Sequence, residues 1–333
     1  MRKDRHHKSI TTEYTELIVI LGPTASGKTQ IATRLAAHIG GEIISADSRQ
    51  VYRRMDIGTG KDLGEYGDVP YHLIDICEPG TKYNLFQYQQ DFHKAYDDIV
   101  SRGKKPILCG GTGLYIEAVL KGYQLAPVPE NPELRKQLEG KTLQELTEML
   151  TELKRRNGSV MHNTTDVDTS QRAIRAIEIE MGEGNRKSVQ PATPVIQSPS
   201  VFGVSIDREL RREKISRRLR ARLDEGMVEE IQGLLNEGIP PENLIYYGLE
   251  YKYVTLYLTG QMSYDDMVSR LEIAIHQFAK RQMTWFRGME RRGISIKWLP
   301  APQTEEEMQE TIELIIQNSK FKIQNSKFIM HNA

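Results

Sequence analysis

The sequence has few cysteines, no excess of charge of either sign and no long apolar run. Its two cysteines, Cys77 and Cys109, lie in different segments without the C-x-x-C spacing of a metal site, so a reducing compartment is expected. The 45 basic and 45 acidic residues cancel, which leaves any nucleic-acid surface to local clusters of charge. No apolar stretch reaches the length of a membrane span, and residues 1–16 lack the apolar segment of a secretory signal. We therefore expect a soluble cytoplasmic protein without a membrane partner.

Apolar runs alternate with helix-like stretches in the first third of the chain. Residues 16–21, 42–46, 71–76 and 106–109 are nearly continuous apolar runs, as in strands buried on both faces of a parallel sheet. Helix-like stretches at 28–39, 85–102 and 113–120 lie between or after them. This alternation predicts an α/β fold with a parallel sheet core flanked by helices.

The pattern changes after Gly122, which predicts a division into parts. We expect a loose N-terminus (1–15), a discontinuous α/β core (16–122 and 200–317), a helical insertion with a linker (123–199) and a frayed tail (318–333). The linker is inferred from a Gly-, Pro- and Ser-rich stretch at 182–200. The core resumes with strands at 201–206 and 294–299, and the tail holds two copies of QNSKF, at 317–321 and 324–328.

Residues 22–29 read GPTASGKT, a complete G-x-x-x-x-G-K-[ST] phosphate loop between an apolar run and a helix-like stretch. Glycines let backbone N–H groups point at a phosphate, and the helix N-terminus adds partial positive charge. Lys28 reaches the outer phosphate oxygens, and the Thr29 hydroxyl can hold Mg²⁺. The predicted site for a phosphorylated small molecule consists of Gly22, Pro23, Thr24, Ala25, Ser26, Gly27, Lys28 and Thr29.

Asp47 ends the second apolar run, in the segment SADSRQVY. We expect its strand to lie beside the strand that feeds the phosphate loop. A carboxylate there can hold Mg²⁺ through water, or it can accept a proton from a nucleophile. The alternative is an N-cap for a following helix, and the residue types alone do not decide between these roles.

Three further motifs are weak when taken singly. Residues 110–115 read GGTGLY, and paired glycines after a strand allow close approach of a ligand. Arg172 and Arg175 share one face of a predicted helix, which can be a binding face or a solvated basic face. Trp285 and Phe286 lie among basic residues, where they can stack on a base or pack in the core.

Together these motifs resemble the tRNA dimethylallyltransferase family, also called tRNA isopentenyltransferases. GPTASGKT, the Asp-Ser-x-Gln-x-Tyr segment ending in MDIGTGK, YHLID, GGTGLY, QRAIRAIE and AKRQMTWFRG occur in the order of that family, over about residues 16 to 300. The resemblance implies a P-loop NTPase-like core and a helical insertion domain that binds tRNA. It also implies transfer of a dimethylallyl group from its diphosphate to the exocyclic amine of the adenosine just 3′ of the anticodon.

The resemblance assigns roles residue by residue. Asp47 corresponds to the base, Thr24 to a contact near the reacting end of the diphosphate, Lys28 to the phosphate-loop lysine, and Arg218 to an arginine that closes over the diphosphate. Mg²⁺, held by Thr29, is the expected cofactor, and the expected partners are dimethylallyl diphosphate and the tRNA anticodon stem-loop, bound by a monomer. The residues that resemble the family's tRNA contacts are Asp47, Ser48, Arg49, Gln50, Thr112, Gln171, Arg172, Ala173, Ile174 and Arg175.

The sequence also departs from the family in the half expected to contact tRNA or close the site. Glu250 replaces a glycine, Ile275-His276 replaces Thr-Arg, and Lys214 replaces an arginine, which weakens bidentate phosphate binding. One hypothesis is therefore a divergent second copy with altered RNA preference or activity. A P-loop kinase that uses ATP and a tRNA-binding homologue with reduced turnover are the alternatives, because the loop alone does not distinguish them.

Overall fold

The computed structural model describes residues 16–123, 125, 128–158, 167–183, 196 and 199–319. The predicted loose N-terminus, most of the predicted linker and the second QNSKF copy lie outside these residues. The chain divides into two compact units, one of residues 1–121 with 194–333 and one of residues 122–193. The predicted insertion extended to residue 199, but residues 194–199 group with the larger unit. The Ser200 amide donates to the Leu17 carbonyl at 3.0 Å, and Ile196 is buried in the core.

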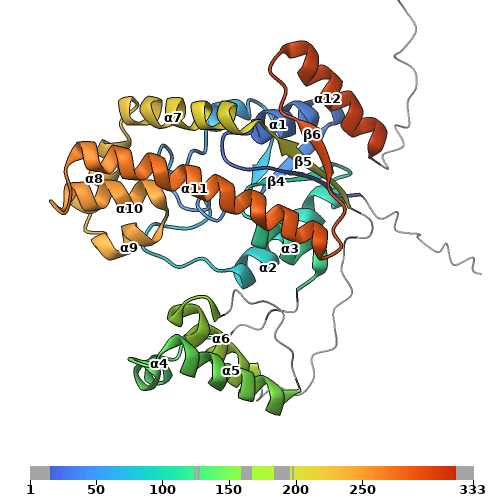
Figure 1. Cartoon of the computed structure of the whole chain (residues 1–333). Helices are drawn as coiled ribbons and strands as arrows, with labels where there is room; N and C mark the ends of the chain where they lie inside the picture. The colour runs from blue at the N-terminus through green and yellow to red at the C-terminus, as the bar shows by residue number, and fades with distance from the viewer. Residues whose placement is uncertain are drawn as a thin grey trace, which may run out of the picture. The chain divides into compact units, whose positions relative to one another are not determined.

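The described residues of the larger unit form one six-stranded parallel sheet, of which β4, β5 and β6 are labelled in Figure 1. The strand order is β3-β2-β4-β1-β5-β6. The strands span β1 Ile18–Leu21, β2 Gly41–Ser45, β3 Tyr71–His72, β4 Lys105–Gly110, β5 Ser200–Ser205 and β6 Lys297–Pro300. The helices of this unit are α1 Lys28–Ile39, α2 Leu85–Ser101, α3 Gly113–Lys121, α7 Arg208–Asp224, α8 Met227–Asn236, α9 Pro241–Tyr246, α10 Leu249–Leu258, α11 Tyr264–Arg291, α12 Glu305–Asn318 and the 3₁₀ turn η1 Leu63–Glu65.

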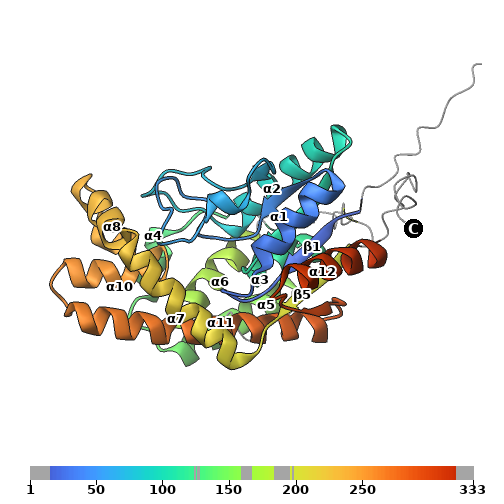
Figure 2. The same cartoon turned by 90° about the horizontal axis from the view of Figure 1, so that it is seen from above.

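Helices cover both faces of the sheet, as the apolar strands require. Ile18 and Ile20 face α1 and α12, while Leu17, Val19 and Leu21 face the other side with α2, α3 and α11. The side with α11 continues into a second layer, where α7, α8 and α10 pack on α11 or on one another (Figure 2). The predicted α/β class and parallel sheet are confirmed.

Two sequence predictions about the strands are wrong. The predicted strand 71–76 shortens to Tyr71–His72, because Leu73 and Asp75 have positive φ angles of 62° and 57° that break an extended strand. The strand before Asp47 was expected beside β1, but β4 lies between β2 and β1. β1 thus pairs with β4 on one side and β5 on the other, and this reversal of strand order marks the edge where α/β sheets bind ligands.

The described residues of the smaller unit form three helices, α4 Pro132–Leu138, α5 Leu143–Asn157 and α6 Ser170–Glu183. Leu134, Leu138, Leu146, Leu150, Ala173 and Ile177 form its apolar core. Thr142 and Glu145 form a capping box at the start of α5, and Gly158 ends that helix with φ 68°. Local capping signals and a period near 3.6 residues therefore account for this all-helical unit.

Candidate functional site

The phosphate loop joins β1 to α1 and leaves the first backbone N–H groups of α1 open. Gly27, the residue before the helix, has φ 81° and provides no side-chain cap. The Ser26 hydroxyl is buried without a hydrogen-bond partner among the described residues. A buried hydroxyl and uncapped N–H groups at a helix N-terminus form a binding site for an anion. Gly22 has no room for a side chain, because a Cβ would lie 2.7 Å from Ser26 Oγ.

Lys28 is the cation at the centre of this loop. Its ammonium Nζ donates to the Pro23 carbonyl at 3.5 Å, a long contact that a stronger acceptor can replace. Burial lowers the pKa of Lys28, and the nearby Cys109 and Asp47 oppose that shift. Asp47 is therefore close enough to act on the Lys28 charge, which places the predicted base and the phosphate loop at one site.

The Asp47 loop is a series of turns without a helix. The Arg49 amide donates to Asp47 Oδ1 at 2.9 Å, which is an Asx turn, and residues 48–54 contain no helix. The alternative that Asp47 caps a following helix is therefore wrong. Asp47 Oδ2 has no hydrogen-bond partner among the described residues, so this oxygen can accept a proton or a water-bound ion.

The GGTGLY segment holds the Asp47 loop against β4. The Thr112 hydroxyl accepts from the Ser48 amide at 3.1 Å, and the Thr112 amide donates to the Ala46 carbonyl at 3.1 Å. Gly110 must lack a side chain here, because a Cβ would lie 2.2 Å from the Ala46 oxygen. The paired glycines therefore serve close approach of two strand ends, and Thr112 has a structural contact in addition to its predicted tRNA contact.

Gln282 of α11 joins the phosphate loop to the GGTGLY segment, a role that the sequence analysis did not assign. Its side-chain oxygen accepts from the Thr24 amide at 2.8 Å, and its side-chain nitrogen donates to the Gly111 carbonyl at 2.9 Å. Gln282 lies in the AKRQMTWFRG segment, and this family motif was the sequence signal that could have pointed to its role. In the same segment Trp285 packs against Gly113 and Phe286 is fully buried, so core packing is the correct alternative for both.

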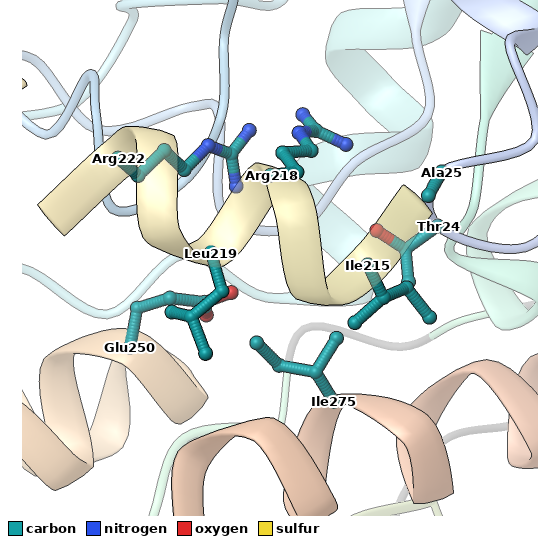
Figure 3. A pocket seen from close by; sticks show the side chains of 8 residues that line it. All are labelled: Thr24, Ala25, Ile215, Arg218, Leu219, Arg222, Glu250 and Ile275. Atoms are coloured by element: carbon teal, nitrogen blue, oxygen red, sulfur yellow. The ribbon is translucent and has the colours of Figure 1, made fainter. Parts of the chain in front are cut away.

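A small cavity brings Arg218 of α7 to the phosphate loop. Thr24, Ala25, Ile215, Arg218, Leu219, Arg222, Glu250 and Ile275 line it, from the phosphate loop, α7, α10 and α11 (Figure 3). Thr24 and Arg218 thus line one cavity, and the charges of Asp47 and Arg218 both act on the pKa of Lys28. Arg218 donates to Asp62 at 2.5 Å and to the Gly60 carbonyl at 3.5 Å.

The departures from the family pattern lie mostly at this cavity or beneath it. Glu250 and Ile275 line the cavity, and burial raises the pKa of Glu250. His276 is partly buried, with Nδ1 lacking a partner among the described residues and Nε2 3.7 Å from Glu272. Ile275 is a core residue of α11 that also lines the cavity, which agrees with a position where the site closes. Lys214 is half-exposed on α7.

The remaining predicted tRNA residues of the Asp47 loop, Arg49 and Gln50, make contacts with neighbouring residues. Gln50 donates to the Gly60 carbonyl at 3.0 Å and accepts from Ser45 at 3.1 Å. The Arg49 guanidinium lies 5.4 Å from the centre of the exposed Tyr246 ring, a cation–π contact.

In the smaller unit, α6 carries the other predicted tRNA residues, and they divide into two groups. Gln171 and Arg172 are exposed, and Arg172 pairs with Asp168 at 2.6 Å. Ala173 is fully buried and Ile174 packs on the same core, so a tRNA contact by the Ala173 side chain is wrong. Arg175 donates to Glu178 at 2.9 Å and to the Val128 carbonyl at 2.7 Å, which makes it a structural residue of this unit.

Comparison with known proteins assigns the family. The family model described as IPP transferase matches residues 50–289, and that described as isopentenyl transferase matches residues 15–66. The chain belongs to the IPP transferase family. A relative from Parabacteroides distasonis, named tRNA dimethylallyltransferase 1, is 62% identical over 308 residues, 91% of this chain and 98% of the relative.

Two further relatives support the same assignment. The protein named tRNA dimethylallyltransferase 2 from Bacteroides fragilis is 60% identical over 92% of this chain and 98% of its own length. The full-length tRNA isopentenylpyrophosphate transferase from Bacillus halodurans has a solved structure with 30% identity and a TM-score of 0.65, covering 91% of this chain and 96% of that one. The fold of that structure is thus shared over most of this chain.

Proposed function

We propose that this protein transfers a dimethylallyl group from dimethylallyl diphosphate to the exocyclic amine of the adenosine just 3′ of the tRNA anticodon. The observation that carries the proposal is the convergence of an open phosphate loop, Lys28, Asp47 and Arg218 on one site. Relatives that are 58–62% identical over nearly their whole length are tRNA dimethylallyltransferases by name, which supports the same reaction here.

Each residue has a distinct task in this reaction. The bond between the allylic carbon and the diphosphate oxygen breaks, and the amine nitrogen forms a bond to that carbon. Charge then develops on the diphosphate, where Lys28, Arg218 and the open N–H groups of α1 stabilise it. Asp47 Oδ2 is available to accept the proton that the amine loses. Thr24, at the rim of the cavity with Arg218, contacts the reacting end of the diphosphate.

Mg²⁺ is the proposed cofactor, and the residues fit it. Among the described residues no group of three His, Cys, Asp or Glu side chains could enclose a metal. Mg²⁺ commonly keeps several waters and takes few protein ligands besides substrate phosphates, so one hydroxyl of the protein suffices beside the diphosphate. Thr29, the second residue of α1, offers that hydroxyl. When bound, the ion would neutralise charge on the leaving diphosphate.

The partners and the cellular location complete the proposal. The tRNA must present its adenosine unstacked to reach a recessed site. The proposed binding residues are the predicted tRNA residues between Asp47 and Thr112 in the larger unit and the exposed residues of α6 in the smaller one. In the described part of the chain, every helix is too short or too polar to cross a bilayer. We propose a monomer that works in the cytoplasm, where its tRNA substrate is made.

The test is incubation of the protein and Mg²⁺ with dimethylallyl diphosphate and unmodified tRNA, followed by mass analysis of the nucleosides. The expected product is dimethylallyladenosine from the position 3′ of the anticodon. A parallel reaction with ATP in place of the allylic diphosphate should give no phosphorylated product. Modified nucleoside only in the ATP reaction would replace the proposal with kinase activity, and tRNA binding without either product would indicate a homologue that lacks turnover.

A further inference from the structure

Two arginines of α7 share one carboxylate at the cavity. Asp62 Oδ2 accepts from Arg218 Nη2 at 2.5 Å and from Arg222 Nη2 at 3.4 Å. The Arg222 side chain is 11% exposed, against 33% for Arg218 and 42% for Asp62. Arg222 is thus the most buried of the three and makes the longer of the two contacts to Asp62. The two arginines stand four residues apart on one helix, so they repel each other.

The chain fixes the position of the Arg222 guanidinium closely. A Cβ on Gly60 would lie 1.7 Å from Arg222 Nη2 and 2.6 Å from Arg218 Nη2, so both guanidiniums rest on the Gly60 backbone. Gly60 itself has φ 63°, a conformation that favours glycine. Burial and the neighbouring Arg218 lower the pKa of Arg222, which are the two expected effects of a desolvated cation beside a like charge.

Glu250 is a second carboxylate near this pair, and its charge opposes the lowering of the Arg222 pKa. Glu250 lines the same cavity, yet among the described residues it makes no ion pair within 4 Å of either arginine. Buried charges in proteins are normally paired and hydrogen-bonded, because desolvation is costly. Among the described residues Arg222 donates one side-chain hydrogen bond, to Asp62, so its other guanidinium N–H groups are available to a ligand in a cavity that Thr24 of the phosphate loop also lines.

We propose that Arg222 is a second guanidinium ligand of the diphosphate, held in place by Asp62 until the substrate displaces that carboxylate. The inference rests on the proposed function and deepens it. A diphosphate carries more negative charge and more acceptor oxygens than one carboxylate, so it satisfies two guanidiniums at once. In the free protein Asp62 accepts hydrogen bonds from both arginines, so it competes with the diphosphate for their guanidinium groups.

The experiment measures binding of inorganic diphosphate to the full chain by calorimetry, with Mg²⁺ present. Arg222→Met should weaken binding roughly 10- to 100-fold, the loss expected for hydrogen bonds between charged groups. Arg220→Met is the matched control, because Arg220 is exposed on the same helix and does not line the cavity. Its diphosphate affinity should equal that of the wild type. Asp62→Asn should tighten binding several-fold, because the competing charge is gone.

Thermal unfolding without ligand separates this role from a structural one. A cation with incomplete partners contributes little to stability, so Arg222→Met should unfold at or above the wild-type temperature. A lower unfolding temperature with unchanged diphosphate affinity would overturn the proposal, and so would weaker binding by Asp62→Asn. If wild-type protein and Lys28→Ala both fail to bind diphosphate, the proposed function fails as well. If wild type binds, Lys28→Ala does not and Arg222→Met does, only the inference about Arg222 fails.

Discussion

At the scale of single residues, the orientation of Asp47 decides whether the site can perform chemistry. Its Oδ1 atom accepts from the Arg49 amide at 2.9 Å, while Oδ2 has no hydrogen-bond partner in the part of the chain that the structure describes. Asp47→Asn keeps the shape of the side chain, and its amide oxygen can still close the Asx turn. We expect transfer to slow by a factor on the order of 10²–10⁴, the usual contribution of a positioned base. Single-turnover rates at saturating substrates measure this, and a near wild-type rate would make Asp47 structural.

At the scale of elements, α11 organises the loops that bind the diphosphate. Gln282→Ala removes both contacts of that side chain and leaves the Thr24 amide and the Gly111 carbonyl without partners. We expect a stability loss of about 1–3 kcal/mol and a higher KM for dimethylallyl diphosphate. Urea unfolding and steady-state kinetics measure the two effects. Gln277→Ala, an exposed position on the same helix, is the control and should change neither.

The edge of the sheet depends on a buried carboxylate that joins three elements. Glu42 of β2 is 3% exposed and accepts from Arg102 at the end of α2, and it lies 2.8 Å from His72 of β3. The Arg102 hydrogen bond is the largest cause that lowers the pKa of Glu42, from 4.5 to about 2. Because the pKa of Glu42 is lower in the folded protein, the ionised carboxylate stabilises the fold above pH 4.5. This contribution is lost as the pH falls toward 2.

Glu42→Gln should therefore reduce the free energy of unfolding by about 1–3 kcal/mol at neutral pH. The difference from the wild type should shrink as the pH falls from 4.5 toward 2, because the wild-type carboxylate then becomes protonated. Urea titrations over this range check the sign. Glu305→Gln, which breaks an exposed ion pair with Arg34, should reduce the free energy of unfolding by at most about 1 kcal/mol. An equal loss from both variants would contradict the role of burial at Glu42.

At the scale of the whole molecule, the proposed function assigns the diphosphate residues to the larger unit and part of the tRNA-binding surface to the smaller one. Arg172 is exposed on α6, so Arg172→Gln should weaken tRNA binding and reduce the slope of log affinity against log salt by about 1. Diphosphate affinity should not change. Arg175→Gln breaks contacts to Glu178 and Val128, so it should lower the stability of the smaller unit. Filter binding at several salt concentrations distinguishes these outcomes, and an unchanged slope would remove Arg172 from the tRNA surface.

The sequence by itself determined the parts whose signals are local. The phosphate loop, the strand before it and the helix after it follow from spacing and apolar pattern, and α1 spans Lys28–Ile39 as predicted. The helical character of the insertion was also predicted, as two or three polar helices over residues 133–181, and the described part of the smaller unit has three. The roles of Asp47, Thr24 and Arg218 were assigned from a family resemblance, because the local sequence pattern around each residue does not specify its role.

Only the tertiary structure decided which distant residues share the site. Gln282 reaches Thr24 across 258 positions of the chain, and Asp62 reaches Arg218 across 156. The strand order that puts β4 between β2 and β1, and the burial of Ala173 and Ile275, depend on long-range packing. A periodic sequence shows that a residue belongs to a helix, but which partner covers its face is fixed when the apolar surfaces of all elements are buried together.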